Sequence, residues 1–298
     1  MKKLLSLILF CSVALVGSAQ NDFLLYSFKG NVSVVESNVE SKAKVGKPLK
    51  STSTLKVAAG GAVTLICNEA AMFTITKAGT YPLNKFGDSC KISSNSVSAN
   101  YVKYVWASMT KTGGAAGSNR KAYMNTVGAV SRNVNNIWID SRLDTVNYTG
   151  GDFPLSWKCY SDDDNFEVSF YDKENISEPL FKTMVTKLKI SIPSFITKLS
   201  AGKSYLWTAA VKGQENDDLK IFNYISKEQF SKVLSNLKSQ VSSFEAPAEQ
   251  AYRLAFMLED AHYLSDAYQY YTKAAALDTA NALYRSTLMS FKKDYEIK

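Results

Sequence analysis

The segments Phe153-Pro154-Leu155-Ser156-Trp157 and Tyr205-Leu206-Trp207-Thr208-Ala209-Ala210-Val211 lie near the two ends of the stretch on which the fold depends. Both are rich in aromatic and branched residues, which fit a pleated, half-buried surface. Between them, residues 166–170 and 188–192 alternate apolar and polar side chains, the period expected of β-strands. The centre of the chain is therefore predicted to form a β-sandwich, between a β-rich N-terminal third and a helical C-terminal quarter.

The central region, residues 136–215, resembles bacterial immunoglobulin-like or fibronectin type III modules. In those modules a tryptophan packs centrally and a Gly-x-x-Tyr-x-Trp-type strand comes late. Here Trp157 and the run Gly202-Lys203-Ser204-Tyr205-Leu206-Trp207 take these places. The resemblance implies a role in spacing or protein contact. Cys159 has no partner at the usual inter-sheet position, so we expect it to be a small core residue.

The N-terminal region, residues 20–97, reads as a series of short strands separated by turns, as in an antiparallel sandwich or roll. The expected strands are 23–28, 32–36, 45–49, 55–57, 62–67, 72–76 and 78–83. Their order resembles the FecR-like domain, through the segments Gly30-Asn31-Val32-Ser33-Val34, Gly46-x-x-Leu49, Gly61-Ala62-Val63-Thr64-Leu65 and Gly79-Thr80-Tyr81. FecR-like regulators carry a cytoplasmic segment and a membrane helix ahead of this domain. Since only a cleavable signal is expected here, we do not predict that regulatory mechanism.

Residues 1–19 have the pattern of a secretory signal peptide. Lys2 and Lys3 are followed by an apolar run at 4–16 and by the small residues Gly17-Ser18-Ala19, which predicts cleavage before Gln20. Cys11 follows Phe10 inside the apolar run, so lipid anchoring is not expected. We expect an exported protein, periplasmic or on the outer surface or secreted, and no later stretch is apolar enough to predict a membrane span.

The cysteines suggest one disulfide. Cys67 shares a predicted strand face with Val63 and Leu65, and Cys90 follows a polar turn in the same region. A Cys67–Cys90 bridge would close a loop of about 22 residues and stabilise by about 3 kcal/mol in the chain-entropy model. The alternative is two buried free thiols. No metal site is predicted, because no cysteine pair has zinc-ligand spacing and Asp162-Asp163-Asp164-Asn165 lacks the glycine of a calcium loop, which favours a solvated hairpin turn.

Residues 98–135 are predicted to connect the β regions. Tyr101, Tyr104, Val105 and Ser108 could line one face of a helix, and Gly113-Gly114-Ala115-Ala116-Gly117 has the composition of a flexible hinge. No strand leads into this glycine-rich run and no Gly-Lys-Ser/Thr follows it, so a phosphate-binding loop is not predicted.

The hydrophobic period changes to that of helices from Ser226 onward, and residues 216–298 are predicted to form a helical domain. Ser226 and Gln229 make a capping box, and Pro247 suits the first position of the next helix. Residues 248–280 resemble a tetratricopeptide repeat, through the small residues Ala255, Ala267 and Ala274 and the aromatic Tyr271, and residues 282–298 would form a capping helix. Ala251 replaces the early tryptophan and Thr279 stands where Asp-Pro usually ends the repeat.

Such repeats usually bind peptides or proteins in a concave face, so the resemblance implies a protein-contact role. The alternative is a packed terminal subdomain without a ligand. Tyr263, Tyr268 and Tyr270 are candidates for an exposed aromatic contact surface, or else ordinary rim residues.

Catalytic equipment is not apparent in the sequence. His262, the only histidine, falls in a predicted helix–helix turn, and no Gly-x-Ser-x-Gly elbow is present. No carboxylate pair sits in a context that marks glycoside hydrolysis. We therefore predict no enzyme activity, no catalytic residues and no cofactor.

The formal net charge of +8 is spread among acidic residues, with no basic cluster of the nucleic-acid type. A weak attraction to acidic polymers is all that this charge suggests. The sequence predicts an exported, non-catalytic scaffold or adaptor that mediates protein–protein interaction in a bacterial envelope. The alternative is a glycan- or envelope-polymer-binding surface protein that uses aromatic residues of the β modules.

Overall fold

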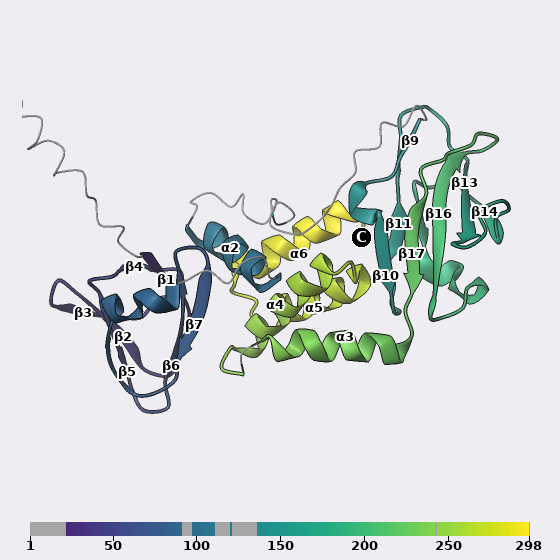
Figure 1. The fold of residues 1–298 in the computed structure, drawn as a ribbon. Helices are drawn as coiled ribbons and strands as arrows, with labels where there is room; N and C mark the ends of the chain where they lie inside the picture. Colours follow the sequence, from purple (N-terminus) through teal and green to yellow (C-terminus); the bar gives the residue numbers. More distant parts are fainter. Residues whose placement is uncertain (1–21, 91–96, 111–119, 121–135, 242, 298) are drawn as a thin grey trace, which may run out of the picture. The chain divides into compact units, whose positions relative to one another are not determined.

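The computed structural model of the protein describes residues 22–90, 97–110, 120, 136–241 and 243–297 (Figure 1). The chain divides into two compact units, residues 1–93 and 94–298. Antiparallel β-structure at the N-terminal end and helices at the C-terminal end agree with the sequence prediction. The predicted signal peptide, its cleavage before Gln20 and the predicted hinge at 113–117 lie outside the described residues.

The first unit contains two four-stranded antiparallel sheets. One has the order β4-β1-β6-β7, formed by Pro48–Lys50, Asp22–Lys29, Ala62–Cys67 and Ala71–Ile75. The other has the order β3-β2-β5-β8, formed by Val39–Lys42, Val32–Glu36, Thr54–Val57 and Gly79–Pro82. The β3 strand was not predicted, because all four of its side chains are exposed and so leave no alternating pattern.

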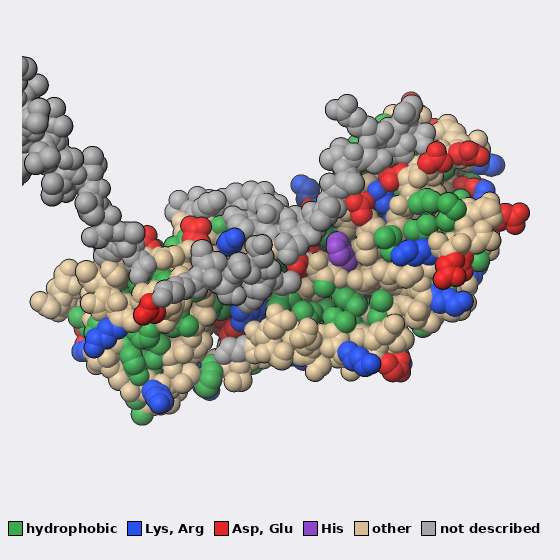
Figure 2. Space-filling view, viewed as in Figure 1, with side chains coloured by type: hydrophobic (Ala, Val, Ile, Leu, Met, Phe, Trp, Pro, Cys, Tyr) green, Lys and Arg blue, Asp and Glu red, His purple; other side chains and the backbone are tan. Residues whose placement is uncertain are grey.

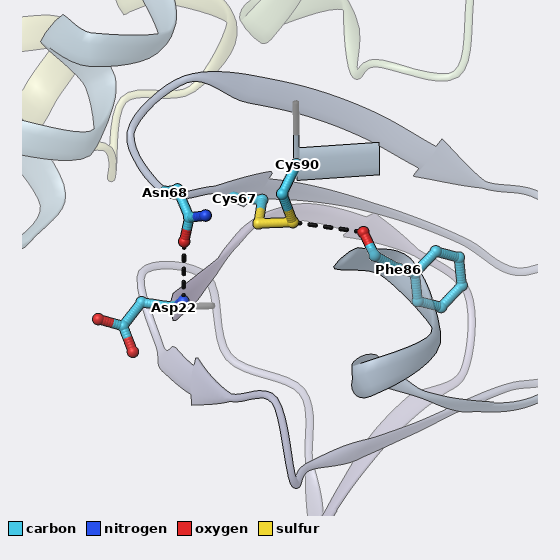
Figure 3. Close-up of a disulfide and its surroundings, with 5 residues drawn as sticks. All are labelled: Asp22, Cys67, Asn68, Phe86 and Cys90. Atoms are coloured by element: carbon cyan, nitrogen blue, oxygen red, sulfur yellow. Dashed lines mark hydrogen bonds between the residues drawn. A yellow bond between two sulfur atoms is a disulfide. The ribbon is translucent and has the colours of Figure 1, made fainter. Parts of the chain in front are cut away.

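A disulfide joins Cys67 to Cys90 at one edge of the core of this unit (Figure 3). Cys67 ends β6, a strand that is buried along its whole length, and Cys90 ends the 3₁₀ segment η1 (Leu83–Cys90). Next to the disulfide, the Asp22 backbone N–H donates to Asn68 Oδ1 at 3.0 Å, which ties the start of β1 to the turn after β6. The crosslink thus fastens η1 onto the core.

The β part of the second unit is a five-stranded mixed sheet with two short strand pairs beside it. The sheet order is β10-β17-β16-β13-β14, formed by Thr145–Tyr148, Lys220–Tyr224, Lys203–Val211, Phe166–Asp172 and Phe181–Val185. The two pairs are β9 (Ile137–Trp138) with β12 (Lys158–Cys159), and β11 (Pro154–Ser156) with β15 (Lys189–Ser191). The core is aromatic: the Phe170 ring lies 4.5 Å from that of Phe195 and 5.9 Å from that of Phe222.

The predicted end of this β region at residue 215 is too early. The β17 strand pairs with β16 in antiparallel fashion and with β10 in parallel fashion, so residues 220–224 complete the sheet. The predicted hairpin turn at Asp162-Asp163-Asp164-Asn165 is also wrong. The strands on either side, β12 and β13, belong to different sheets, so this segment is a connection between sheets. Cys159 lies half-buried on β12 rather than in the core.

Four helices follow the sheet: α3 (Lys227–Ser239), α4 (Pro247–Asp260), α5 (Leu264–Leu277) and α6 (Ala282–Asp294). The predicted capping box is confirmed, because the Gln229 N–H donates to Ser226 Oγ and the Ser226 N–H donates to Gln229 Oε1. The α4 helix begins at Pro247, as predicted, where the missing N–H costs no intrahelical hydrogen bond. Small buried residues, Ala255 on α4 and Ala267 on α5, let the two helices approach closely.

The predicted connector, residues 98–135, includes part of the helical body. Helix α2 (Val97–Thr110) packs on α4, and the Tyr104 ring stacks on Phe256 with 5.2 Å between centroids. The Tyr104 hydroxyl shares a hydrogen bond of 3.0 Å with Thr287 of α6 and accepts one of 3.1 Å from Tyr252 of α4. Because these hydroxyls are buried, their mutual bonding removes a desolvation cost that would otherwise oppose packing.

The sheet and the helices of the second unit are hydrogen-bonded to each other, so they do not form the separate β and α domains that the sequence suggested. The Asn147 N–H of β10 donates to the His262 carbonyl oxygen at 2.9 Å. Thr149 Oγ1 donates to Asp266 Oδ2 at 2.8 Å, and Ser265 Oγ donates to the Gly150 carbonyl oxygen at 2.6 Å. The start of α5 therefore docks on the end of β10 (Figure 1).

Within the described part of the chain, none of the helices has the length and apolar character needed to cross a bilayer.

Candidate protein-interaction groove

An open groove of about 490 Å³ lies on the helical part of the second unit, bounded by α3, the α3–α4 connection, α4 and α5. Its lining residues are Lys238, Val241, Ser243, Pro247, Gln250, Ala251, Leu254, Tyr270 and Lys273. Figure 2 shows hydrophobic side chains gathered between α3 and the α4–α5 hairpin on the face in view. We call this hollow the α3–α5 groove.

The floor of the groove is formed by one face of α4. Ala251 and Leu254 are spaced three residues apart, so they lie on the same side of the helix, and both are buried. The small side chain of Ala251 contributes little volume to the floor. Gln250 is held in place because its Nε2 donates to the Glu245 carbonyl oxygen at 2.9 Å.

The walls of the groove are basic and aromatic. Two of the lining residues, Lys238 and Lys273, are cationic, and none is acidic. The Lys273 ammonium lies 6.0 Å from the centroid of the Tyr270 ring, at the outer range of a cation–π contact. Burial, and to a smaller extent the charge of Asp266, raise the pKa of Tyr270 above its ordinary value. As a tyrosine phenol is protonated at neutral pH, it can donate a hydrogen bond.

The predicted contact surface of Tyr263, Tyr268 and Tyr270 does not exist as one exposed patch. Tyr263 is only 7% exposed, and its ring packs 5.3 Å from that of Phe230 on α3. Tyr268 is half-buried and stacks on Phe291 of α6 at 6.1 Å. Tyr270 alone lines the groove. The three residues separate because Tyr263 precedes α5 and the other two, two positions apart, point to different sides of that helix.

The apolar side chains of α3 are only partly buried. Only Leu237 of α3 is buried, whereas Phe230, Val233 and Leu234 remain half-exposed, and Phe244 beyond the helix is 53% exposed. A helix whose whole apolar stripe packed into a core would bury all of these side chains. Exposed apolar surface beside a hollow is typical of interaction sites. Lys238 and Lys273 were missed because nothing in their local sequence sets them apart from other surface lysines.

The structure places His262 in the turn between α4 and α5, with a positive φ of 62°. Its half-buried imidazole has a lowered pKa, chiefly because burial disfavours the charged form. Its backbone carbonyl is used to dock β10, as described above. Among the described residues, no group of three or more His, Cys, Asp or Glu side chains could hold a metal ion.

No protein-family model matches this chain, and no curated protein matches it either.

Proposed function

We propose that the protein is an exported, non-catalytic scaffold that holds a protein partner of the cell envelope in the α3–α5 groove. The observation that carries the proposal is a groove of about 490 Å³ that α3 lines through Lys238, together with the half-exposed apolar residues Phe230, Val233 and Leu234 of the same helix. The resemblance of α4 and α5 to a tetratricopeptide repeat supports it, since those repeats receive peptides between their helices. The FecR-like and immunoglobulin-like resemblances of the β regions support a spacing or anchoring role for them.

The partner segment that fits this groove is extended and carries acidic side chains. Two lysines and no carboxylate line the walls, so a negatively charged segment is attracted and a positively charged one is repelled. Tyr270 and Leu254 offer apolar surface for its side chains. No catalysis and no cofactor are part of this proposal.

A site-specific photo-crosslinker tests the proposal in the native cell envelope. A crosslinker at Ser243, which lines the groove, should capture one discrete protein, whereas one at Ser231, exposed elsewhere on α3, should not. Reversing the groove charges with Lys238→Glu and Lys273→Glu should abolish the capture. The matched control Lys232→Glu, on the same helix outside the groove, should retain it. Equal capture at both serines, or capture that survives the double charge reversal, would refute the proposal.

A further inference from the structure

A second and smaller cavity, of about 180 Å³, lies in the second unit between the short strands of the β part and the end of α6. Its lining residues are Trp138, Asp140, Arg142, Ser156, Trp157, Lys158, Lys293, Asp294 and Glu296. Cavities at the junction of two packed bodies are a common place for small ligands. We call this hollow the strand–helix cavity.

The walls of the strand–helix cavity are fixed by an ion-pair network. Arg142 Nη1 lies 2.8 Å from Asp294 Oδ1, and Arg142 Nη2 pairs with Asp140 Oδ2. The other oxygen of Asp294 lies 2.9 Å from Arg120 Nη1. Next to the cavity, the Lys189 ammonium donates to the Glu296 carbonyl oxygen at 2.6 Å. These contacts join residues 140–142 and the strand β15 to the C-terminal end of the chain around Asp294 and Glu296.

Outside this network the cavity lining has two cationic donors, Lys158 and Lys293, and one carboxylate, Glu296. Arg142 pairs with both Asp140 and Asp294, and Arg120 pairs with the other oxygen of Asp294, so these two carboxylates already have cationic partners. In the described part of the chain, Lys158 and Lys293 enter none of the ion pairs, although the Lys158 ammonium lies 5.1 Å from the Trp138 ring centroid. The buried indole N–H of Trp157 likewise has no acceptor among the described residues.

The volume of the cavity and its tryptophan side chains indicate which class of ligand could fit. A volume of about 180 Å³ is below the range of about 300–1,000 Å³ that is typical for drug-sized ligands, so it accepts a single ring. Trp138 and Trp157 present apolar ring surface, which can pack against the C–H face of a sugar ring. Lys158 and Lys293 can donate charge-assisted hydrogen bonds to a carboxylate. Together these features fit a ring that is apolar on its faces, polar at its rim and negatively charged.

We propose that the strand–helix cavity binds a carboxylate-bearing sugar ring, a hexuronic acid, with Lys158 and Lys293 on its carboxylate and the two tryptophans against its ring. The sugar acid is either free or a residue of an acidic polysaccharide. This site is separate from the α3–α5 groove and does not depend on the proposed protein partner.

Titration of the full-length exported protein with glucuronate, glucose and acetate tests this assignment, with intrinsic tryptophan fluorescence and calorimetry as readouts. Glucuronate should bind saturably and change the fluorescence. Glucose should bind about tenfold or more weakly, as expected from losing a charge-assisted hydrogen bond. Binding of acetate as tight as that of glucuronate would overturn the proposal, because it would show a simple anion site. The absence of saturable glucuronate binding would also overturn it.

Substitutions of the lining lysines test whether glucuronate binds in the strand–helix cavity. Lys293→Gln, at an exposed side chain, and Lys158→Gln should each weaken glucuronate binding about tenfold. Lys292→Gln, the neighbouring residue outside the cavity, should not change it. Unchanged affinity in Lys293→Gln, a substitution that leaves the buried network intact, would contradict the assignment. The source of the ligand is tested by comparing galacturonate with its linear tetramer. Tighter binding of the tetramer identifies an acidic polysaccharide as the source. Binding of the galacturonate monomer that is at least as tight identifies the free sugar acid.

Discussion

Arg120 and Glu259 form a buried, two-pronged ion pair across 139 residues of sequence. Arg120 Nε lies 2.8 Å from Glu259 Oε2, and Arg120 Nη2 lies 2.9 Å from Glu259 Oε1. The side chains are 0% and 1% exposed. Tyr271 and Tyr295 also donate to the same carboxylate, at 3.0 and 3.1 Å. A residue from the predicted connector is therefore part of the core of the helical body.

Replacing Arg120 with Met should destabilise the second unit by about 3–5 kcal/mol, because Glu259 would be left buried without its counter-charge. Urea unfolding followed by circular dichroism measures this. The double variant Arg120→Met, Glu259→Leu removes both charges, so its loss should be smaller than the loss from Arg120→Met alone. A double variant that is the less stable of the two would show that the unpaired Glu259 carboxylate is not the cause of the loss, which would contradict our explanation.

Reduction of the Cys67–Cys90 disulfide should lower the free energy of unfolding of the first unit by about 3 kcal/mol, because the unfolded chain regains the entropy of a loop with a sequence separation of 23. Denaturant unfolding with and without dithiothreitol measures the change. Cys159→Ser is the matched control, since Cys159 is a free thiol. It should leave the sensitivity to dithiothreitol intact, whereas the double variant Cys67→Ser, Cys90→Ser should abolish it.

The stability of the second unit should depend on pH through Asp266. Burial raises the pKa of this carboxyl from 3.8 to about 6, against the opposing hydrogen bond from Thr149. The folded state therefore binds the proton more tightly than the unfolded state. The resulting cost is fully present above pH 6, and it disappears as the pH falls from about 6 to below 4.

The variant Asp266→Asn isolates this effect. It should be more stable than the parent protein above pH 6, by up to about 3 kcal/mol at 1.36 kcal/mol per pKa unit. Below pH 4 the two proteins should have nearly the same stability. Unfolding midpoints measured from below pH 4 to pH 8 provide the comparison, with Asp162→Asn, at an exposed residue, as control. A constant difference between Asp266→Asn and the parent at every pH would contradict the prediction.

Gly151→Ala should loosen the docking of α5 on the loop after β10. Gly151 has a φ of +87°, and an added Cβ would lie 2.7 Å from Ser265 Oγ, the atom that donates to Gly150. Gly202→Ala is the matched control, because Gly202 has a φ of +84° and no atom within 4 Å of the added Cβ. Both variants place an alanine at a positive φ, which costs about 1–2 kcal/mol of folding free energy. Only in Gly151→Ala does the added Cβ also clash with Ser265. Thermal unfolding should show the larger loss for Gly151→Ala, and equal losses would rule out the clash.

Local patterns in the sequence predicted much of the secondary structure. Apolar runs located β1, β2 and β6, and the Ser226–Gln229 capping box located the start of α3. Three strands were not predicted because the local sequence does not mark them as strands. The strands β3 and β14 lie at sheet edges with many exposed side chains, so neither shows a clear buried face. The strand β17 follows a short polar segment of the sequence. Its pairing with β10 and β16 is what distinguishes it from a loop.

The sequence by itself determined the order and type of the main elements and the capping of α3, because those depend on side chains only a few positions apart. The tertiary structure decided that Arg120 meets Glu259, that β17 completes the sheet, and that one tyrosine of the predicted three lines a groove. These features depend on which faces of distant elements meet. Periodicity shows that a helix or strand has a buried face, but it does not show which partner covers that face or where the covering is incomplete.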